Sequence, residues 1–295
     1  MSRIEPYLDE LQTQNRKALI PYITAGDPYP GITVQLMHTL VAAGADVIEL
    51  GIPFSDPMAD GPTVQRAVEN ALAFGVTLPD VLSMVEQFRQ QNETTPIVLM
   101  GYLNPIEHMG YQAFADRCDA VGVDGVLTVD MPPEESDALA LALKAHQIDR
   151  IFLASPTTRE HRMQMIAAHA TGYLYYVSLK GITGSDTMDI NAVTAKLEAI
   201  RSVTSIPVGV GFGIKTPEMA AAVAKVADGV VVGSAIINNI HAAYNRLGGV
   251  QGEQPQEPDV MCHAICNAAE QLVKGMREAM DAAVSDVAID KGRRN

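Results

Sequence analysis

The chain has few cysteines, and their positions exclude a disulfide-stabilised scaffold. Cys118, Cys262 and Cys266 are an odd number of cysteines in a chain of 295 residues, whereas disulfide frameworks use many cysteines in short chains. Cys262 and Cys266 flank His263 in an apolar, alanine-rich helical pattern, with no second pair of ligands nearby. We therefore expect these cysteines to pack in a helix rather than to hold a metal ion.

Basic side chains are also scarce. Lys and Arg total 21 against 35 Asp and Glu, which gives a formal net charge of −14 at pH 7. Nucleic-acid binding needs a basic surface, so the composition argues against that class of protein. An anionic substrate would have to be held by local hydrogen-bond donors.

No apolar run reaches the roughly 18 to 20 residues that a membrane span requires. The first residues, Met1-Ser2-Arg3-Ile4-Glu5, lack the apolar core of a signal peptide. We expect no membrane association and a cytoplasmic location. With 47% hydrophobic residues and a mean hydropathy of +0.08, the chain can build a sizeable core.

Three similar segments indicate a repeated unit. They are Gly44-Ala45-Asp46-Val47, Gly122-Val123-Asp124-Gly125-Val126 and Ala227-Asp228-Gly229-Val230. Each ends an alanine-rich helical stretch and opens a β-branched run, which is typical of a βα unit.

The other apolar runs extend this pattern to eight strands. We predict strands at 19–24, 47–51, 97–101, 125–129, 151–154, 173–177, 207–211 and 229–233. Helical patterns between them include 31–43, 78–91, 134–146, 160–169, 191–202 and 217–225. Eight parallel strands in a chain of this length predict an α/β fold, a (β/α)₈ TIM barrel, with a doubly wound open sheet as the alternative.

Further segments are added to this barrel. Residues 4–15 predict a leading amphipathic helix, 62–73 a helix after the second strand, and 235–244 a short helix after the eighth. A polar loop at 248–258 precedes a last helix at about 259–284. We expect one domain over 1–284, followed by a disordered tail at 285–295.

Glu49 is the most informative residue of the predicted strands. Strand alternation places it on one face with Val47 and Gly51, and none of the eight predicted strand segments contains a Lys, an Arg or another acid. Burying a carboxylate without a partner is unfavourable unless its pKa rises. Isolated carboxyls of this kind are usually functional, which makes Glu49 a candidate acid/base group.

Asp56 and Asp60 follow on the loop after the second strand, at the end of the barrel where TIM-barrel active sites lie. For Asp56, an ordinary solvated side chain is as good an interpretation as a functional acid. Asp60 is better placed, because Gly61-Pro62 predicts the start of a helix that would fix it over the barrel mouth.

Loops after strands six, seven and eight predict a phosphate site and a lid. Residues 178–186 are rich in small residues and include Thr183, which offers a hydroxyl. An ordinary long connection is the alternative for this loop. Glycine-rich turns at 209–213 and 233–235 follow the strands where such barrels often bind phosphate through backbone N–H groups.

Apolar side chains at the strand ends would line the rest of the pocket, although any one of them could equally be barrel filling. They are Tyr22, Met100, Leu127, Val129, Leu153, Tyr175 and Phe212. No histidine lies in a predicted strand, so we expect no metal site. The ligand would have a flat apolar end and a phosphorylated end.

These residues resemble the family of tryptophan synthase α subunits. Val47 to Gly61 is similar to the signature segment of that family. The segments 19–28 (Leu-Ile-Pro-Tyr-Ile-Thr-Ala-Gly-Asp-Pro), 181–184 (Gly-Ile-Thr-Gly) and 211–214 (Gly-Phe-Gly-Ile) are in register with it. The similarity covers about residues 4 to 280. Tyr22 departs from the family pattern, in which an apolar aromatic residue is common.

The resemblance implies a lyase of tryptophan biosynthesis that cleaves indole-3-glycerol phosphate to indole and glyceraldehyde 3-phosphate. It implies catalytic roles for Glu49, Asp60 and Tyr175, with Glu49 transferring protons, Asp60 meeting the indole N–H and Tyr175 assisting. Backbone and hydroxyl groups at Gly184, Gly213, Gly233 and Ser234 would hold the phosphate. No cofactor is expected on this subunit; pyridoxal phosphate is expected on a partner β subunit, in an αββα heterotetramer.

Two other functions stay open from the residues themselves. One is another phosphate-binding barrel, an isomerase or epimerase of sugar phosphates, which the apolar pocket disfavours. The other is a non-catalytic barrel that only activates a partner subunit, which the pair Glu49 and Asp60 disfavours.

Overall fold

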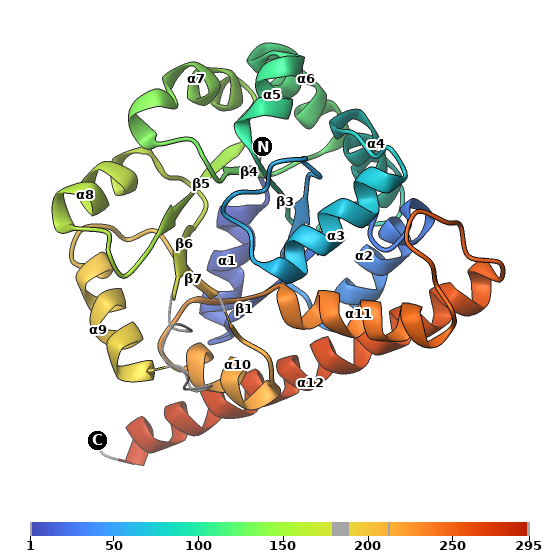
Figure 1. Ribbon diagram of the computed structural model, residues 1–295. Coiled ribbons are helices and arrows are strands. Elements are labelled where there is room, and N and C mark those ends of the chain that lie inside the picture. The colour runs from blue at the N-terminus through green and yellow to red at the C-terminus, as the bar shows by residue number, and fades with distance from the viewer. Residues whose placement is uncertain (1, 179–188, 212, 294–295) are drawn as a thin grey trace.

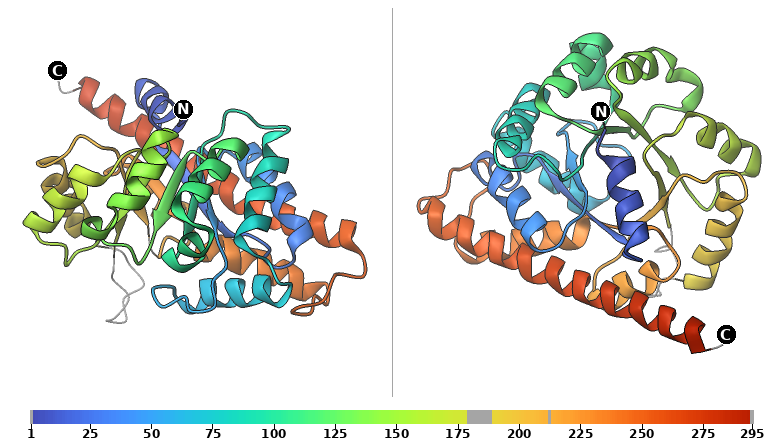
Figure 2. Two further views of the ribbon diagram at one scale, coloured as in Figure 1. Left: turned by 90° about the horizontal axis from the view of Figure 1, so that it is seen from above. Right: turned by 180° about the vertical axis from the view of Figure 1, so that it is seen from behind.

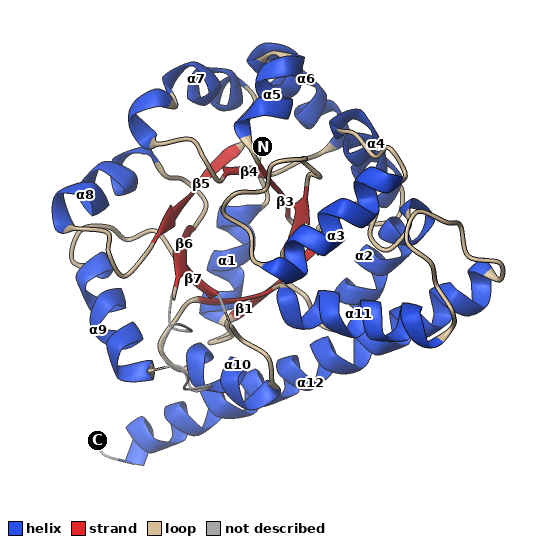
Figure 3. Ribbon diagram, in the orientation of Figure 1, coloured by secondary structure: helices blue, strands red, loops and turns tan. Residues whose placement is uncertain are grey.

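Eight parallel strands close into a barrel in the order in which they occur along the chain. The computed structural model describes residues 2–178, 189–211 and 213–293. The strands form a ring that helices surround (Figures 1 and 3). They are β1 Ala18–Thr24, β2 Ile48–Gly51, β3 Ile97–Gly101, β4 Gly125–Thr128, β5 Asp149–Ala154, β6 Leu174–Val177, β7 Val208–Gly211 and β8 Gly229–Val232. The predicted TIM barrel is confirmed and the open sheet is wrong.

Helices connect the strands and cover the outside of the barrel. They are α1 Ile4–Thr13, α2 Thr33–Ala42, α3 Pro62–Ala73, α4 Leu78–Arg89, α5 Leu103–Met109, α6 Tyr111–Val121, α7 Asp137–Ala145, α8 Glu160–His169, α9 Ile190–Arg201, α10 Pro217–Ala224, α11 Ser234–Arg246 and α12 Pro258–Arg293, with short 3₁₀ turns η1 Pro30–Ile32 and η2 Pro133–Glu135. The predicted extra helices at the N-terminus, after β2 and after β8 are α1, α3 and α11.

Helix α1 closes one end of the barrel. It lies across the opening of the ring when the molecule is seen from behind (Figure 2, right). Ile4, Leu8 and Leu11 of this helix are buried among the side chains that fill the barrel, such as Ile20 and Val47. The predicted amphipathic helix at 4–15 therefore acts as an apolar plug, and the opposite end remains as the mouth.

The three similar sequence segments each place an aspartate at the start of a strand. The carboxylate oxygen Oδ2 of Asp46 accepts a hydrogen bond from the backbone N–H of Leu19 at 2.8 Å, and Oδ2 of Asp124 accepts from Ile97 at 2.8 Å. Asp228 Oδ2 accepts from the N–H of Val208 at 3.0 Å. Each aspartate thus connects the start of its own strand to the preceding strand, so the repeated motif sets strand pairing.

The expectation that Glu49 is the only charged residue of the strands is wrong. Strand β5 begins at Asp149, before the predicted start at residue 151, because its ladder with β4 extends to the pairs Gly125–Asp149 and Val126–Arg150. Both charged residues lie at the start of the strand, away from the mouth, and are half-buried. Among the described strand residues, Glu49 is still the only fully buried Asp, Glu, Lys, Arg or His.

The last helix is longer than predicted. It continues to Arg293, so residues 285–293 are helical rather than a disordered tail. Neither glycine nor proline interrupts 276–291, and this alanine-containing stretch has good helix propensity. The helix runs along one side of the barrel against α10 and α11 (Figure 1).

In the described part of the chain, no single helix is long and apolar enough to cross a membrane. Only α3 and α4 taken together reach that length and composition, and they are bent by 94° relative to each other.

The aspartates at the strand starts generate a stability prediction. Asp124 is fully buried, and it bonds to the N–H of Ile97 and to the guanidinium groups of Arg3 and Arg89 at 2.8 Å. Asp124→Ala would leave these donors unpaired, so we expect unfolding to become easier by about 3 to 5 kcal/mol. Urea unfolding midpoints measure this loss.

Asp116→Ala is the matched control, because Asp116 is exposed and pairs with His146 on the surface. We expect it to shift the urea midpoint much less than Asp124→Ala, because exposed ion pairs contribute little to stability. If the two variants shifted the midpoint equally, the buried aspartate would not have the role assigned to it.

Candidate active site

Glu49 lies inside the barrel, on the strand that precedes the acidic loop. In the strand register it pairs with Tyr22 of β1 on one side and Val98 of β3 on the other. Its side chain is fully buried. The predicted position of Glu49 in the barrel interior is therefore confirmed.

Within the described part of the chain, one oxygen of the Glu49 carboxyl group is hydrogen-bonded and the other is not. The hydroxyl of Tyr173 donates to Oε1 at 2.5 Å, while the buried Oε2 has no hydrogen-bond partner among the described residues. Burial raises the pKa of Glu49 to about 7, and the Tyr173 bond partly opposes this rise. Near neutral pH the carboxyl group can therefore both donate and accept a proton.

The sequence did not predict Tyr173 as a hydrogen-bond partner of Glu49, for which no partner was expected. Tyr173 precedes β6 and is fully enclosed in the barrel filling. Strand alternation places residues 173 and 175 on the same face, so the motif Tyr173-Leu174-Tyr175 contained the signal.

Asp60 is fixed immediately before α3, as the Gly61-Pro62 pair predicts. The hydroxyl of Tyr102 donates to Asp60 Oδ2 at 3.0 Å and accepts from the N–H of Ala59 at 3.0 Å. Gln65 donates to the Asp60 carbonyl oxygen at 2.8 Å. Burial raises the pKa of the Asp60 carboxyl, whereas the Tyr102 bond lowers it. Tyr102, at the start of α5, is a second partner that the sequence reasoning missed.

Asp56 lies on the same loop but is exposed, and its Oδ2 accepts a hydrogen bond from the hydroxyl of its neighbour Ser55 at 2.7 Å. This environment agrees with the interpretation of Asp56 as a solvated loop residue. The two aspartates of the loop therefore differ in burial and in partners.

Two tyrosines lie close to both carboxyl groups. Burial raises the pKa of Tyr175, and the negative charges of Glu49 and Asp60 raise it further. Burial also raises the pKa of Tyr22, and the negative charges of Asp60 and Glu49 add to that rise. Glycines make room for their hydroxyls, because a Cβ at Gly51 would overlap the Tyr22 hydroxyl and one at Gly211 the Tyr175 hydroxyl. Both tyrosines stay neutral hydrogen-bonding groups.

The predicted apolar wall separates into two depths. Met100, Val129 and Leu153 are half-buried and pack on the edge of the barrel filling, as does Tyr175. Leu127 is fully buried deeper in the same cluster. The first group can contact a ligand at the mouth, and Leu127 supports it from below.

The end of β8 has the features of an anion site. Gly233 is the N-cap of α11 without a side-chain cap, and Ser234 is the exposed first residue of that helix. Backbone N–H groups at a helix N-terminus attract anions. Gly213 has φ +77° and open space around it, so a ligand can approach its backbone. The predicted site residues Thr183, Gly184 and Phe212 lie outside the described residues.

A buried polar cluster joins the two sides of the mouth. Asp27, which follows β1, accepts a hydrogen bond from Asn70 of α3 at 2.9 Å and lies 2.8 Å from Nε2 of His241 on α11. Asp27 therefore holds the helix that follows Asp60 against the helix that begins at Ser234. Sequence reasoning assigned no role to this cluster.

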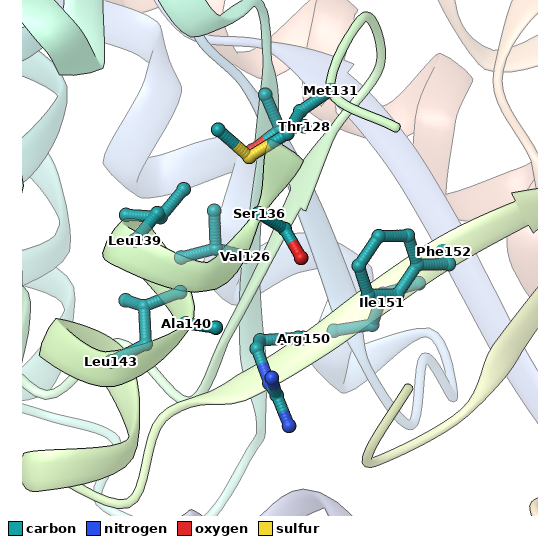
Figure 4. A pocket seen from close by; sticks show the side chains of 10 residues that line it. All are labelled: Val126, Thr128, Met131, Ser136, Leu139, Ala140, Leu143, Arg150, Ile151 and Phe152. Atoms are coloured by element: carbon teal, nitrogen blue, oxygen red, sulfur yellow. The ribbon is translucent and has the colours of Figure 1, made fainter. Parts of the chain in front are cut away.

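A small hollow on the outside of the barrel is unrelated to the mouth. It lies between α7 and strands β4 and β5, and its volume of about 20 Å³ is comparable to a single water molecule (Figure 4). Its lining is mainly apolar, with Ser136 and Arg150 as polar members. It is too small for a substrate.

Comparison with known proteins gives consistent matches over nearly the whole chain. A family model described as tryptophan synthase alpha chain matches residues 8–264. The tryptophan synthase alpha chain of Marinobacter nauticus is 53% identical over 281 residues, which cover 95% of this chain and 98% of that protein. The corresponding protein of Nitrosococcus oceani is 52% identical over 282 residues, covering 96% of this chain and 98% of that protein.

The structural comparison gives the same family. The crystal structure of tryptophan synthase subunit alpha from Legionella pneumophila str. Paris has a TM-score of 0.84 to this chain at 48% identity. The match covers 96% of this chain and 99% of that chain. Sequence and fold therefore point to one family.

The raised pKa of Glu49 predicts a pH-dependent stability. Between about pH 4.5, the ordinary value for Glu, and about pH 7, the unfolded chain releases this proton while the folded chain keeps it. The free energy of unfolding therefore falls as pH rises through this window. Relative to Glu49→Gln, we expect the wild type to lose about 2 to 3 kcal/mol across it.

Urea unfolding of both proteins at a series of pH values measures this difference. Glu198→Gln, on the exposed surface of α9, is the matched control for replacing a glutamate by a glutamine. Parallel curves for wild type and Glu49→Gln would show that Glu49 has an ordinary pKa.

Proposed function

The chain belongs to the tryptophan synthase alpha chain family, and we propose that Glu49 and Asp60 carry out its reaction. As a lyase of tryptophan biosynthesis, it cleaves indole-3-glycerol phosphate to indole and glyceraldehyde 3-phosphate. The observation that carries the assignment is the Glu49 carboxyl group, buried inside the barrel with one unpartnered oxygen and a pKa raised to about 7.

The reaction requires two proton transfers. Breaking the bond between indole C3 and the side chain requires a proton at C3 and removal of a proton from the adjacent side-chain hydroxyl. A carboxyl group with a pKa near the working pH is suited to both steps. Glu49 Oε2 is free to exchange the proton, while Tyr173 holds Oε1 in place.

Asp60 has the complementary task. Protonation of C3 leaves positive charge on the indole ring, and a carboxylate near the ring N–H stabilises that charge. Tyr102 and the start of α3 hold Asp60 in one orientation before substrate arrives. Tyr175, near both carboxyl groups, would assist as a neutral hydrogen-bonding group.

The rest of the substrate would be bound by the strand ends. Tyr22, Met100, Leu127, Val129, Leu153 and Phe212 would enclose the indole, with Thr183 closing over it. Gly184, Gly213, Gly233 and Ser234 would hold the phosphate through N–H and hydroxyl groups, and the uncapped N-terminus of α11 supports this assignment. Such a site suits a chain with a net charge of −14.

The alpha chain name implies a β-chain partner. We propose that the two form an αββα heterotetramer in the cytoplasm, in which the β subunit carries pyridoxal phosphate and receives indole. This chain would need no cofactor of its own, because proton transfer and charge stabilisation account for the cleavage.

Glu49→Gln tests the proton-transfer role. The amide keeps the shape of the side chain but cannot exchange a proton, so we expect indole release to fall by about 10²- to 10⁴-fold. Near-normal turnover would remove Glu49 from the mechanism. Glu198→Gln serves as the matched surface control.

Asp60→Asn tests charge stabilisation. We expect kcat to fall by about 10²-fold or more with the circular dichroism spectrum unchanged. Asp56→Asn is the control on the same loop, since Asp56 is exposed, and it should leave indole release by the isolated chain unchanged. Equal kinetics for the two variants would argue against the role of Asp60.

An indole-release assay with and without purified β subunit separates this function from the two others. A sugar-phosphate isomerase or epimerase would exchange protons on a sugar phosphate and release no indole. A non-catalytic activator would stimulate the β reaction without cleaving substrate in either condition. The nearly full-length match to an alpha chain at 53% identity supports neither the isomerase or epimerase function nor the non-catalytic function.

A further inference from the structure

Tyr22 connects the two ends of the site. Its ring packs against Ala67 of α3 and Ile237 of α11 and is only 7% exposed. A Cβ built on Gly233, the glycine that begins α11, would lie 3.3 Å from a carbon of this ring. The ring therefore lies directly beside the proposed phosphate turn.

The hydroxyl of Tyr22 lies at the other end of the side chain, toward the carboxyl groups. It occupies the space above Gly51, which follows Glu49 on the same face of β2. It forms a hydrogen bond with the Thr24 hydroxyl at 3.2 Å. A tyrosine hydroxyl can donate one hydrogen bond and accept others, so the bond to Thr24 leaves it capacity for a ligand.

The surroundings of Tyr22 keep its phenol protonated. Burial raises the pKa of Tyr22 above its ordinary value, and the nearby negative charges of Asp60 and Glu49 raise it further. The phenol therefore keeps its proton wherever the protein works. It can orient a polar group by hydrogen bonding but cannot serve as an acid or base.

We propose that the Tyr22 hydroxyl binds a hydroxyl of the substrate's glycerol side chain. This inference rests on the proposed function. Indole-3-glycerol phosphate carries two hydroxyls between its ring and its phosphate, and one of them loses its proton during cleavage. The Tyr22 side chain spans this interval, because its ring lies beside the phosphate turn at Gly233 and its hydroxyl lies over Gly51 of β2, toward the carboxyl groups.

A hydrogen bond from Tyr22 would favour a substrate with a glycerol linker over one with an alkyl linker between the indole and the phosphate. The walls at Met100, Val129 and Leu153 are apolar and recognise the indole equally well with any side chain. The phosphate turn likewise does not distinguish a glycerol from an alkyl linker. Tyr22 would supply this discrimination.

The test compares two ligands in Tyr22→Phe, which keeps the ring and removes only the hydroxyl. One ligand is indole-3-glycerol phosphate, followed by kcat/KM of indole release in the presence of the β subunit. The other is indole-3-propanol phosphate, which keeps the ring and phosphate but lacks both hydroxyls, followed by its inhibition constant. We expect kcat/KM to fall by about three- to tenfold, the effect of one neutral hydrogen bond, and the inhibition constant to change by less than about twofold.

Tyr176→Phe is the matched control, because Tyr176 is a buried tyrosine of β6 that packs outside the barrel. Both quantities should stay at their wild-type values in it. Equal weakening of both ligands by Tyr22→Phe would assign the hydroxyl to packing and overturn the inference, as would no change in either.

The inference and the proposed function fail in different ways. If Glu49→Gln abolishes indole release while Tyr22→Phe changes neither ligand, only the role of Tyr22 is lost. If the wild-type complex releases no indole, the proposed function itself is lost.

Discussion

The burial of one carboxyl group inside the barrel is the constraint on which the site depends. Among the described residues, Glu49 has no cationic neighbour in the strand ladder and a single side-chain hydrogen bond, from Tyr173, so it keeps its proton to a much higher pH than an ordinary glutamate. The apolar plug from α1 maintains this condition by keeping the far end of the barrel filled. Asp60, half-buried and bound by Tyr102, lies in a more polar environment. Two carboxyl groups at the same mouth therefore differ in burial and in hydrogen bonding.

Much of the architecture could be predicted because it follows from local patterns. β-branched runs separated by helical stretches predict eight strands, and Gly61-Pro62 predicts the start of α3. The repeated aspartates indicated strand starts, but only the structure shows that Asp46, Asp124 and Asp228 each bind the N–H of the preceding strand. That contact joins residues far apart in sequence, and no local pattern specifies it.

The errors have similar causes. The ladder between β5 and β4 includes Asp149 and Arg150, because backbone pairing at the start of a strand does not require apolar side chains. No glycine or proline interrupts residues 276–291, so the helix continues beyond the apolar pattern that predicted its end at about residue 284. Partners such as Tyr173 lie beside strands far away in sequence, and contacts across a closed barrel depend on register rather than on sequence spacing.

The account depends on Glu49 holding a proton near neutral pH, and this can be measured directly. The chain would be labelled with ¹³C at the glutamate carboxyl carbons, and its NMR signals would be followed from acidic to alkaline pH, with Glu49→Gln used to assign the Glu49 signal. The account predicts that this signal titrates with a midpoint near the raised pKa of about 7. A Glu49 signal with a midpoint near 4.5, the ordinary value for a glutamate, would contradict it.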